Sequence, residues 1–371
     1  MEGAAPSAPV ESRLNGETSG ADGAAPSTEQ ASSRVHMPDP YLTPARFWRV
    51  LAILSVILVA AAVASALVGA EPIHLTRALG EAGVDRIILF RIRLPRALLA
   101  IVVGAALAAA GTVLQALLRN PLADPHMLGV SGGAAVGAAA MLMLGGTGAL
   151  PAVLVPIGAF GGGLLAMLVV YRVGSVHGRL QPYMFLLAGV VTNAFCGALI
   201  MALNALADFF QAHGILFWLL GSLQTQSYAL VAASGAYVLV GLGWLMRHAR
   251  RFNALSLGEE SAAQLGVDVA RVRRTAFVIS SLLVGAAVSV SGMIGFVGLI
   301  VPHITRLLIG ADHRLLLPAS ALTGATFLLL ADTVARSTFG ATEIPVGVVT
   351  ALCGGPFFVY LLRREGGRGV E

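Results

Sequence analysis

The side chains best suited to specific chemistry are three arginines at the ends of apolar stretches. Arg93 and Arg96 belong to an Arg-Leu-Pro-Arg turn that opens one stretch, and Arg336 ends another in ADTVARSTFG. A guanidinium can bind a carboxylate through two hydrogen bonds, so such arginines suit recognition of acidic residues on a partner. The alternative is that they anchor helix ends at the lipid–water interface. Residue type alone leaves both interpretations open.

A loop bounded by two prolines is the second candidate. Residues 119–125 read RNPLADP and contain Asn120 and Leu122. The prolines fix the backbone and end the flanking helices, and Asn tolerates turn geometry. The sequence therefore predicts a rigid connection between two helices.

The third candidate is a polar segment, residues 252–269, inside an otherwise apolar chain. It reads FNALSLGEESAAQLGVDV. Ser256 as N-cap, acidic residues in the first turn and Gly266 at the end predict a short helix. Leu257, Ala262 and Leu265 give that helix an apolar face. A surface connection is the simplest interpretation, but the loop is also large enough to dock a soluble subunit.

Composition argues against several kinds of active site. All 24 basic residues are arginine, and a phosphate-binding P-loop requires lysine, so any ATP must be bound by another polypeptide. An ion-coupled transporter needs ionisable groups near the membrane midplane. Here Asp332 and Glu343 lie near span ends. An intramembrane enzyme needs paired acid–base residues within the spans, and the sequence shows no such pair. His303 and His313 suit structural roles better than ligand roles. We expect no catalytic residue, metal or cofactor.

Long apolar runs must position these candidates. The chain is 57% hydrophobic and 12% charged, about half the charged fraction of a soluble domain. We expect an all-α integral membrane protein with about ten spans. The predicted spans are residues 47–69, 96–118, 127–146, 150–171, 184–206, 228–246, 275–294, 296–309, 315–335 and 343–362.

The arginines also predict the orientation of these spans. Most lie in loops that share one side when the chain starts in the cytoplasm, which follows the positive-inside rule. The exceptions are Arg91 and the three arginines named first. We therefore expect a multi-pass protein of the inner (plasma) membrane with both termini cytoplasmic. Residues 1–44 contain almost no large apolar side chains and are expected to be a disordered cytoplasmic tail. Residues 45–365 form the membrane domain, and 366–371 a short tail.

Five motifs together resemble one family, over about residues 47–365. They are RLPR, RNPLADP, LGEESAAQLGV, GFVGLIVPH and EIPVGVVTALCGGPFF. The sequences of these motifs are similar to those of the FecCD-type ABC importer permeases, which carry iron–siderophore complexes, haem or cobalamin. The long N-terminal tail has no counterpart in this resemblance.

The resemblance implies a type II importer architecture and a role for each candidate. Two permease copies would form a homodimer, served by two ABC ATPase subunits and by a periplasmic or lipoprotein substrate-binding protein. Membrane lipid is the remaining partner, and no nucleic acid is expected. The implied docking residues for the binding protein are Arg93, Arg96 and Arg336. The implied cytoplasmic gate is Asn120 and Leu122. The implied ATPase-coupling residues are Leu257, Gly258, Glu259, Ala262, Leu265 and Gly266.

The permease itself would then be a transporter subunit and not an enzyme, since the partner hydrolyses ATP. We expect an iron(III)–siderophore as the cargo, with cobalamin or haem as alternatives within the same family. An ion-coupled secondary transporter is the alternative outside the family.

Overall fold

A computed structural model of the 371-residue chain describes residues 42–69, 71–80, 83–145, 153–176, 179–223, 227–338 and 343–366. Residues 1–41 and 367–371, which contain nearly all of the two predicted tails, lie outside the described residues. Within the described part the regular secondary structure is helical, apart from two antiparallel strands of two residues each (β1, Ser175–Val176; β2, Arg179–Leu180).

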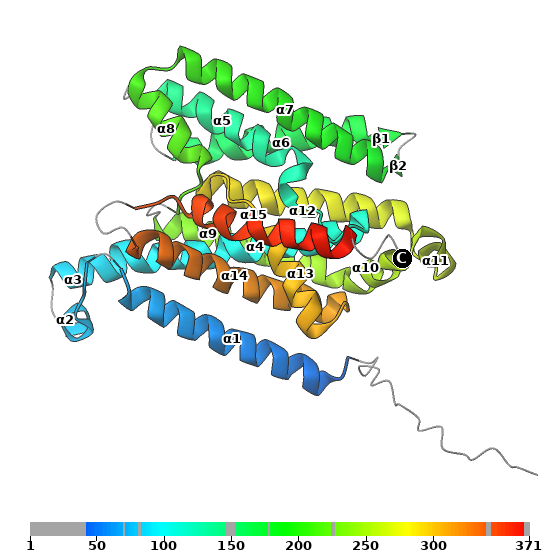
Figure 1. The fold of residues 1–371 in the computed structure, drawn as a ribbon, viewed down its shortest axis with the longest axis horizontal. Helices are drawn as coiled ribbons and strands as arrows, with labels where there is room; N and C mark the ends of the chain where they lie inside the picture. Colours follow the sequence, from blue (N-terminus) through cyan, green and yellow to red (C-terminus); the bar gives the residue numbers. More distant parts are fainter. Residues whose placement is uncertain are drawn as a thin grey trace, which may run out of the picture. The chain divides into compact units, whose positions relative to one another are not determined.

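The helices follow one another through the unit that begins at Leu42 (Figure 1). In order they are α1 Pro44–Leu67, α2 Leu75–Gly80, α3 Val84–Ile87, the π-helical η1 Ile88–Arg93, α4 Leu94–Leu118, the 3-10 turn η2 Pro125–Leu128, α5 Val130–Gly145, α6 Leu154–Gly174, α7 Pro182–Leu206, α8 Phe209–Leu219, α9 Tyr228–Arg247, α10 Ala249–Ser256, α11 Glu259–Gln264, α12 Val269–Ser291, α13 Val297–Ile309, α14 His313–Ser337 and α15 Val346–Gly366.

The predicted spans coincide with helices of the described chain. Seven helical segments are long and apolar enough to cross a bilayer: α1, the continuous segment Val84–Leu118, α6, α7, α9, α12 and α14. The other three predicted spans match the shorter apolar helices α5, α13 and α15. Pro302 lies inside α13, which has only 13 residues and is shorter than a helix needs to be to cross a bilayer.

One helix was missed. No helix was predicted between the spans 184–206 and 228–246, but α8 occupies Phe209–Leu219. Its start is a capping box: the Asp208 side chain accepts from the Gln211 N–H, and the Gln211 side chain accepts from the Asp208 N–H. These two bonds satisfy donors that a helix start otherwise leaves open.

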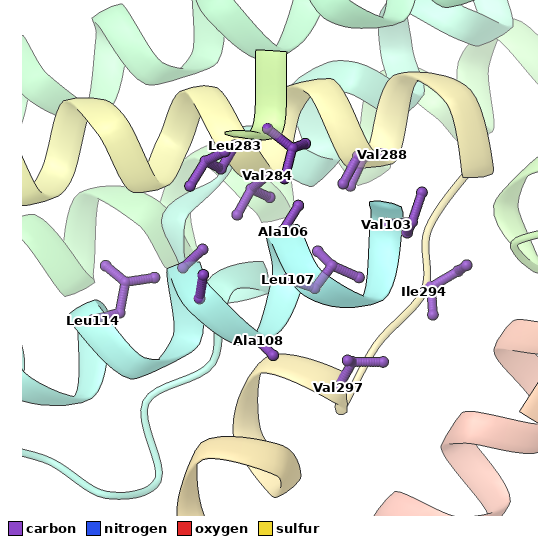
Figure 2. Packing of buried hydrophobic residues seen from close by; sticks show 14 of the residues in the cluster. Val103, Ala106, Leu107, Ala108, Leu114, Leu283, Val284, Val288, Ile294 and Val297 are labelled. Carbon is purple, nitrogen blue, oxygen red and sulfur yellow. The ribbon is translucent and has the colours of Figure 1, made fainter. Parts of the chain in front are cut away.

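Helix α4 is the centre of the packing. Its most apolar window is 78% buried within the single chain. Helices α12 and α13 lie against it (Figure 2), and α14 packs against it as well. Small residues allow this close approach. A Cβ added to Gly111 would lie 1.9 Å from the carbonyl oxygen of Gly298, and one added to Gly104 would lie 2.3 Å from that of Gly324. Neither site has room for a side chain.

The peripheral helices have the opposite character. The corresponding windows of α1 and α7 are only 11% and 17% buried. They expose large apolar side chains such as Trp48, Val59, Phe195 and Met201. In water such surfaces would be unfavourable, so a bilayer or a second protein must cover them.

Candidate functional site

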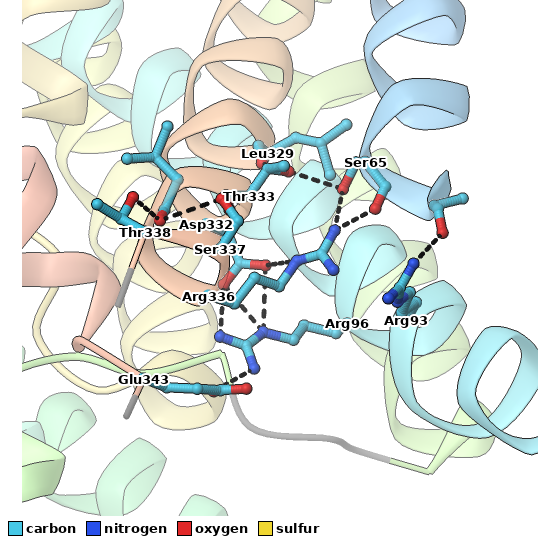
Figure 3. A network of polar contacts seen from close by, with 12 residues as sticks. Ser65, Arg93, Arg96, Leu329, Asp332, Thr333, Arg336, Ser337, Thr338 and Glu343 are labelled. Carbon is cyan, nitrogen blue, oxygen red and sulfur yellow. Dashed lines mark hydrogen bonds and ion pairs between the residues drawn. The ribbon is translucent and has the colours of Figure 1, made fainter. Parts of the chain in front are cut away.

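Arg93, Arg96 and Arg336, which we call the three-arginine cluster, come together where α1, α4 and α14 meet (Figure 3). Arg93 Nη1 donates to the carbonyl oxygens of Ala66 and Leu67, each at 2.9 Å. These carbonyls belong to the end of α1, where helical partners run out. Arg93 therefore caps α1 from the start of α4.

Arg336 holds the same end of α1 from α14. Its Nη2 donates to the Ser65 hydroxyl at 2.9 Å and to the Ser65 carbonyl oxygen. Thr333, one turn earlier in α14, donates its hydroxyl to Ser65 Oγ at 2.8 Å. The last turn of α1 is thus fixed by polar contacts from two other helices.

Asp332 is the anion inside the cluster. Arg96 Nε lies 3.0 and 3.1 Å from its two carboxylate oxygens, and Arg336 Nε lies 3.6 Å from Oδ2. Glu343 adds a second carboxylate, with Oε2 2.7 Å from Arg96 Nη1. The side chain of Asp332 is 1% exposed and that of Glu343 is 54% exposed. Neither acid was predicted to pair with the arginines, although Asp332 and Arg336 have the i, i+4 spacing of helical ion pairs.

The cluster is buried in the single chain. Arg93, Arg96 and Arg336 are only 5%, 7% and 7% exposed. The structure therefore brings the predicted docking residues together and also supplies each with partners inside the chain. Their role toward a binding protein stays a prediction.

The two-proline loop lies at the opposite end of α4. Arg119 ends that helix in the left-handed conformation (φ 47°). Asn120 Oδ1 accepts from the Leu122 N–H at 2.9 Å, and Asp124 Oδ1 accepts from the His126 N–H at 2.7 Å. These side-chain bonds close local turns, so the predicted short connection between two helices is confirmed. Asn120 is exposed and Leu122 is half-buried.

The predicted short helix exists as α11, on the same side of the bundle as this loop. It begins after Gly258 (φ 117°) and ends before Gly266 (φ 76°), both in conformations that favour glycine. The expected N-cap was wrong. Ser256 is the last residue of α10, and its hydroxyl donates to the Phe252 carbonyl oxygen.

The apolar residues of this segment do not share one face. Ala262 is fully buried against the protein. Leu257 and Leu265 are 69% and 65% exposed, so two large apolar side chains point away from the chain. Glu259, the first residue of α11, forms ion pairs with Arg119 and Arg273.

An open cavity of about 870 Å³ adjoins the two-proline loop. Its walls come from η2, α7, α8, α13 and α15, and they are mainly apolar. Phe296 in this wall has a left-handed backbone (φ 67°), and its ring fills the space that a Cβ on Gly354 would need. The polar lining includes Asp124, His126 and Asn193. The cavity residues could not be predicted as a group, because they come from five separated segments of the chain.

The two histidines considered as ligands lie in structural surroundings. The backbone N–H and Nδ1 of His313 both lie 2.8 Å from Asn253 Oδ1. Asn253 in turn donates to Asp312 at 2.8 Å. His303 is buried within α13. In the part of the chain that the structure describes, no three His, Cys, Asp or Glu side chains are grouped as a metal ion would require.

The Asp312 contacts also affect its ionisation. Burial opposes the charge, but hydrogen bonds from Arg314 and Asn253 outweigh it and lower the pKa of the Asp312 carboxyl to about 2. Asp312 also caps the start of α14 by accepting from the Arg314 N–H. Asn253, Asp312 and His313 thereby join α10 to α14.

Comparison with known proteins places this geometry in a family. The model of the FecCD transport family matches residues 48–364. The cobalamin import system permease protein BtuC of Halobacterium salinarum is 48% identical over 284 residues, which cover 75% of this chain and 74% of the relative. The hemin transport system permease protein HmuU of Yersinia pestis is 41% identical over 322 residues, or 85% of this chain and 95% of the relative.

A solved structure agrees with these relatives. The inward-facing conformation of a metal-chelate type ABC transporter superposes with a TM-score of 0.75 at 35% identity, covering 85% of this chain and 99% of that one. The family match thus includes the three-arginine cluster, the two-proline loop and α11 within one continuous range. The chain belongs to the FecCD transport family, a family of multi-pass membrane permeases of ABC importers.

Proposed function

We propose that this chain is the permease of an ABC importer that moves a metal chelate across the inner membrane. Two copies enclose one pathway, two separate ATPase subunits drive it, and a binding protein delivers the cargo. The observation that carries the proposal is the family match over residues 48–364. The chain also lacks lysine, so it has no P-loop of its own.

The positive-inside pattern supports an orientation with α11 in the cytoplasm. There Leu257 and Leu265 offer two exposed apolar contacts, one on each side of the short helix α11. Such a helix suits insertion into a cleft of the ATPase, in the helix-in-groove manner. The proposed coupling residues are Leu257, Gly258, Glu259, Ala262, Leu265 and Gly266.

The cavity suits one half of the pathway. Its volume of about 870 Å³ is within the range of sites that hold ligands of several hundred daltons. The loop 119–125 contributes Asp124 to its wall. We propose that Asn120 and Leu122 of this loop close the cytoplasmic end.

At the external end, we propose that the three-arginine cluster receives acidic residues of the binding protein. Glu343 is the exposed anion of the cluster, and it binds Arg96 at 2.7 Å. A carboxylate of the binding protein could replace Glu343 there without disturbing buried Asp332. Encounter would then depend on charge and weaken with salt.

The candidate cargoes all belong to one class, the metal chelates. We retain the iron(III)–siderophore as the sequence-based expectation. The names of the relatives, which refer to cobalamin and hemin, make cobalamin and haem the second candidates.

The test is uptake into proteoliposomes that contain the permease, its ATPase and its binding protein. Ferrichrome, cyanocobalamin and haemin are supplied separately, with ATP or with a non-hydrolysable analogue. We expect ATP-dependent uptake of one of the three. Leu257→Arg with Leu265→Arg should abolish uptake, whereas Leu308→Arg, at a similarly exposed leucine near the Arg306 end of α13, should leave uptake intact. Uptake that persists without the ATPase would contradict the proposal.

A further inference from the structure

Glu259 stands between two arginines from different parts of the chain. Its carboxylate binds Arg273 in α12 through Oε1, and the same oxygen lies 3.8 Å from Arg119 Nη2 in the two-proline loop. We call these three residues the Glu259 bridge. A Cβ on neighbouring Gly258 would also lie 3.8 Å from Arg119 Nη1, so the loop arginine lies directly over the start of α11.

The two arginines differ in burial. The side chain of Arg273 is 9% exposed, and its Nε has no hydrogen-bond partner. A buried cation with incomplete hydrogen bonding is costly unless an anion stays beside it. Glu259 is the anion that the structure pairs with Arg273. This ion pair fixes the position of Glu259 relative to α12.

Arg119 is the exposed side of the bridge. Its side chain is 49% exposed, and its contact with Glu259 is longer than a hydrogen bond. Its backbone, however, is held in the left-handed turn that starts the loop of Asn120 and Leu122. A shift of Glu259 therefore acts on the loop through the guanidinium of Arg119.

Among the described residues, no other hydrogen bond or ion pair joins segment 257–266 to loop 119–125. We propose that Glu259 is a positioning residue that transmits movement of α11 to the cytoplasmic gate through Arg119. This inference rests on the proposed function and adds the contact through which the two elements communicate.

The test measures the gate directly and needs no transported cargo. The permease is purified with its ATPase, Cys196 and Cys353 are replaced by Ala, and Leu122→Cys carries a spin label in each protomer. The distance between the two labels is measured by pulsed EPR without nucleotide and with ATP plus vanadate. ATP hydrolysis is measured on the same samples.

We expect Glu259→Gln and Arg119→Asn each to reduce the nucleotide-dependent shift in the ratio of the two label-distance populations about five-fold, the change in an equilibrium constant expected for loss of one coupling contact. ATP hydrolysis should continue in Arg119→Asn, which lies outside the proposed coupling residues. Asn tolerates the left-handed backbone at position 119, so Arg119→Asn keeps the fold and leaves the Arg273 pair intact. Arg119→Lys should restore the response, and the double variant should be no worse than either single one.

Two controls remove charge nearby without touching the bridge. Glu260→Gln alters the next residue of α11, which is exposed and has no ion pair in the described chain. Asp268→Asn removes an exposed pair with Arg271 and keeps the N-cap of α12. Neither should change the response.

The outcomes separate the bridge from the gate itself. If the unsubstituted gate responds to nucleotide and Arg119→Asn responds equally, the bridge is overturned while the proposed function stands. If the labels in the parent protein do not respond to nucleotide at all, the gate assignment and the bridge both fail.

Discussion

The three-arginine cluster and the Glu259 bridge have the same arrangement of charges in different surroundings. The cluster is buried in protein, and the bridge is partly exposed to water. Each places one carboxylate between two arginines, at opposite ends of α4. Asp332 in the cluster is 1% exposed, and Glu259 in the bridge is 44% exposed. Water screens charges strongly and the protein interior does not. The cluster is therefore suited to fixing helices, and the bridge to contacts that form and separate during transport.

This difference follows from neighbouring groups and not from residue type. In the cluster, α1 supplies backbone carbonyls that complete the arginines' hydrogen bonding. In the bridge, Arg119 extends from a loop and half of its side chain meets solvent. Removal of a buried anion should consequently cost far more than removal of an exposed one.

The largest expected effect is that of Asp332→Asn. This change leaves Arg96 and Arg336 buried with less compensation, and it should lower the free energy of unfolding by about 3–5 kcal/mol. The measurement is chemical unfolding in detergent micelles, with Asp268→Asn as the exposed Asp-to-Asn control. A loss below about 1 kcal/mol, the level of a surface pair, would remove the distinction between the two regions.

A smaller effect on the free energy of unfolding is expected at low pH, at the α10–α14 contact. This contact lies near the bridge. The pKa of Asp312 is lowered from 3.8 to about 2 in the folded chain, so folding favours its charged form. Its stabilising contribution is complete above pH 4 and is lost as the pH falls toward 2. Because Asp312 is partly exposed, we expect at most about 1 kcal/mol. The measurement is the pH dependence of unfolding, compared between wild type and Asp312→Asn. Equal slopes for the two between pH 4 and 2 would contradict this expectation.

The smallest effect on stability should come from Glu343→Gln. Its carboxylate pairs with Arg96 but is 54% exposed, and exposed pairs contribute about 0.2–1 kcal/mol. We expect a change in the free energy of unfolding of about 0.5 kcal/mol that decreases with added salt. If Glu343→Gln destabilises the chain as much as Asp332→Asn, the cluster acts as one unit and has no exchangeable anion.

Much of the fold could be predicted because hydropathy in a bilayer depends on local sequence. The ten spans follow from runs of apolar residues, and α11 follows from its acidic first turn and its glycine end. The Ser256 cap failed for a local reason: Gly258 has φ 117°, so the chain starts α11 two residues later. Helix α8 was missed although the Asp208–Gln211 capping box was visible in the sequence.

The site could be predicted less completely, because its geometry depends on distant pairs. Loop 119–125 and α11 were identified as separate candidates. Their connection through Arg119 and Glu259 joins positions 140 residues apart, and no periodic pattern indicates such a pair. Likewise, an arginine at a span end has the same sequence signal whether it faces a partner protein or an aspartate of its own chain.

The separation of Arg96 and Asp332 along the chain also has a consequence for biosynthesis. Their hydrogen bonds span 236 residues, whereas those of Arg93 to the end of α1 span only 26 and 27. At a synthesis rate of about 5–20 residues per second, the α1–α4 contact can form within about 1–5 s, while Arg96 must wait about 10–50 s for Asp332. During that interval Arg96 lies at a helix end, where its side chain can reach interfacial water. Helix α4 can thus insert into the membrane long before α14, whose Asp332 neutralises Arg96, has been synthesised.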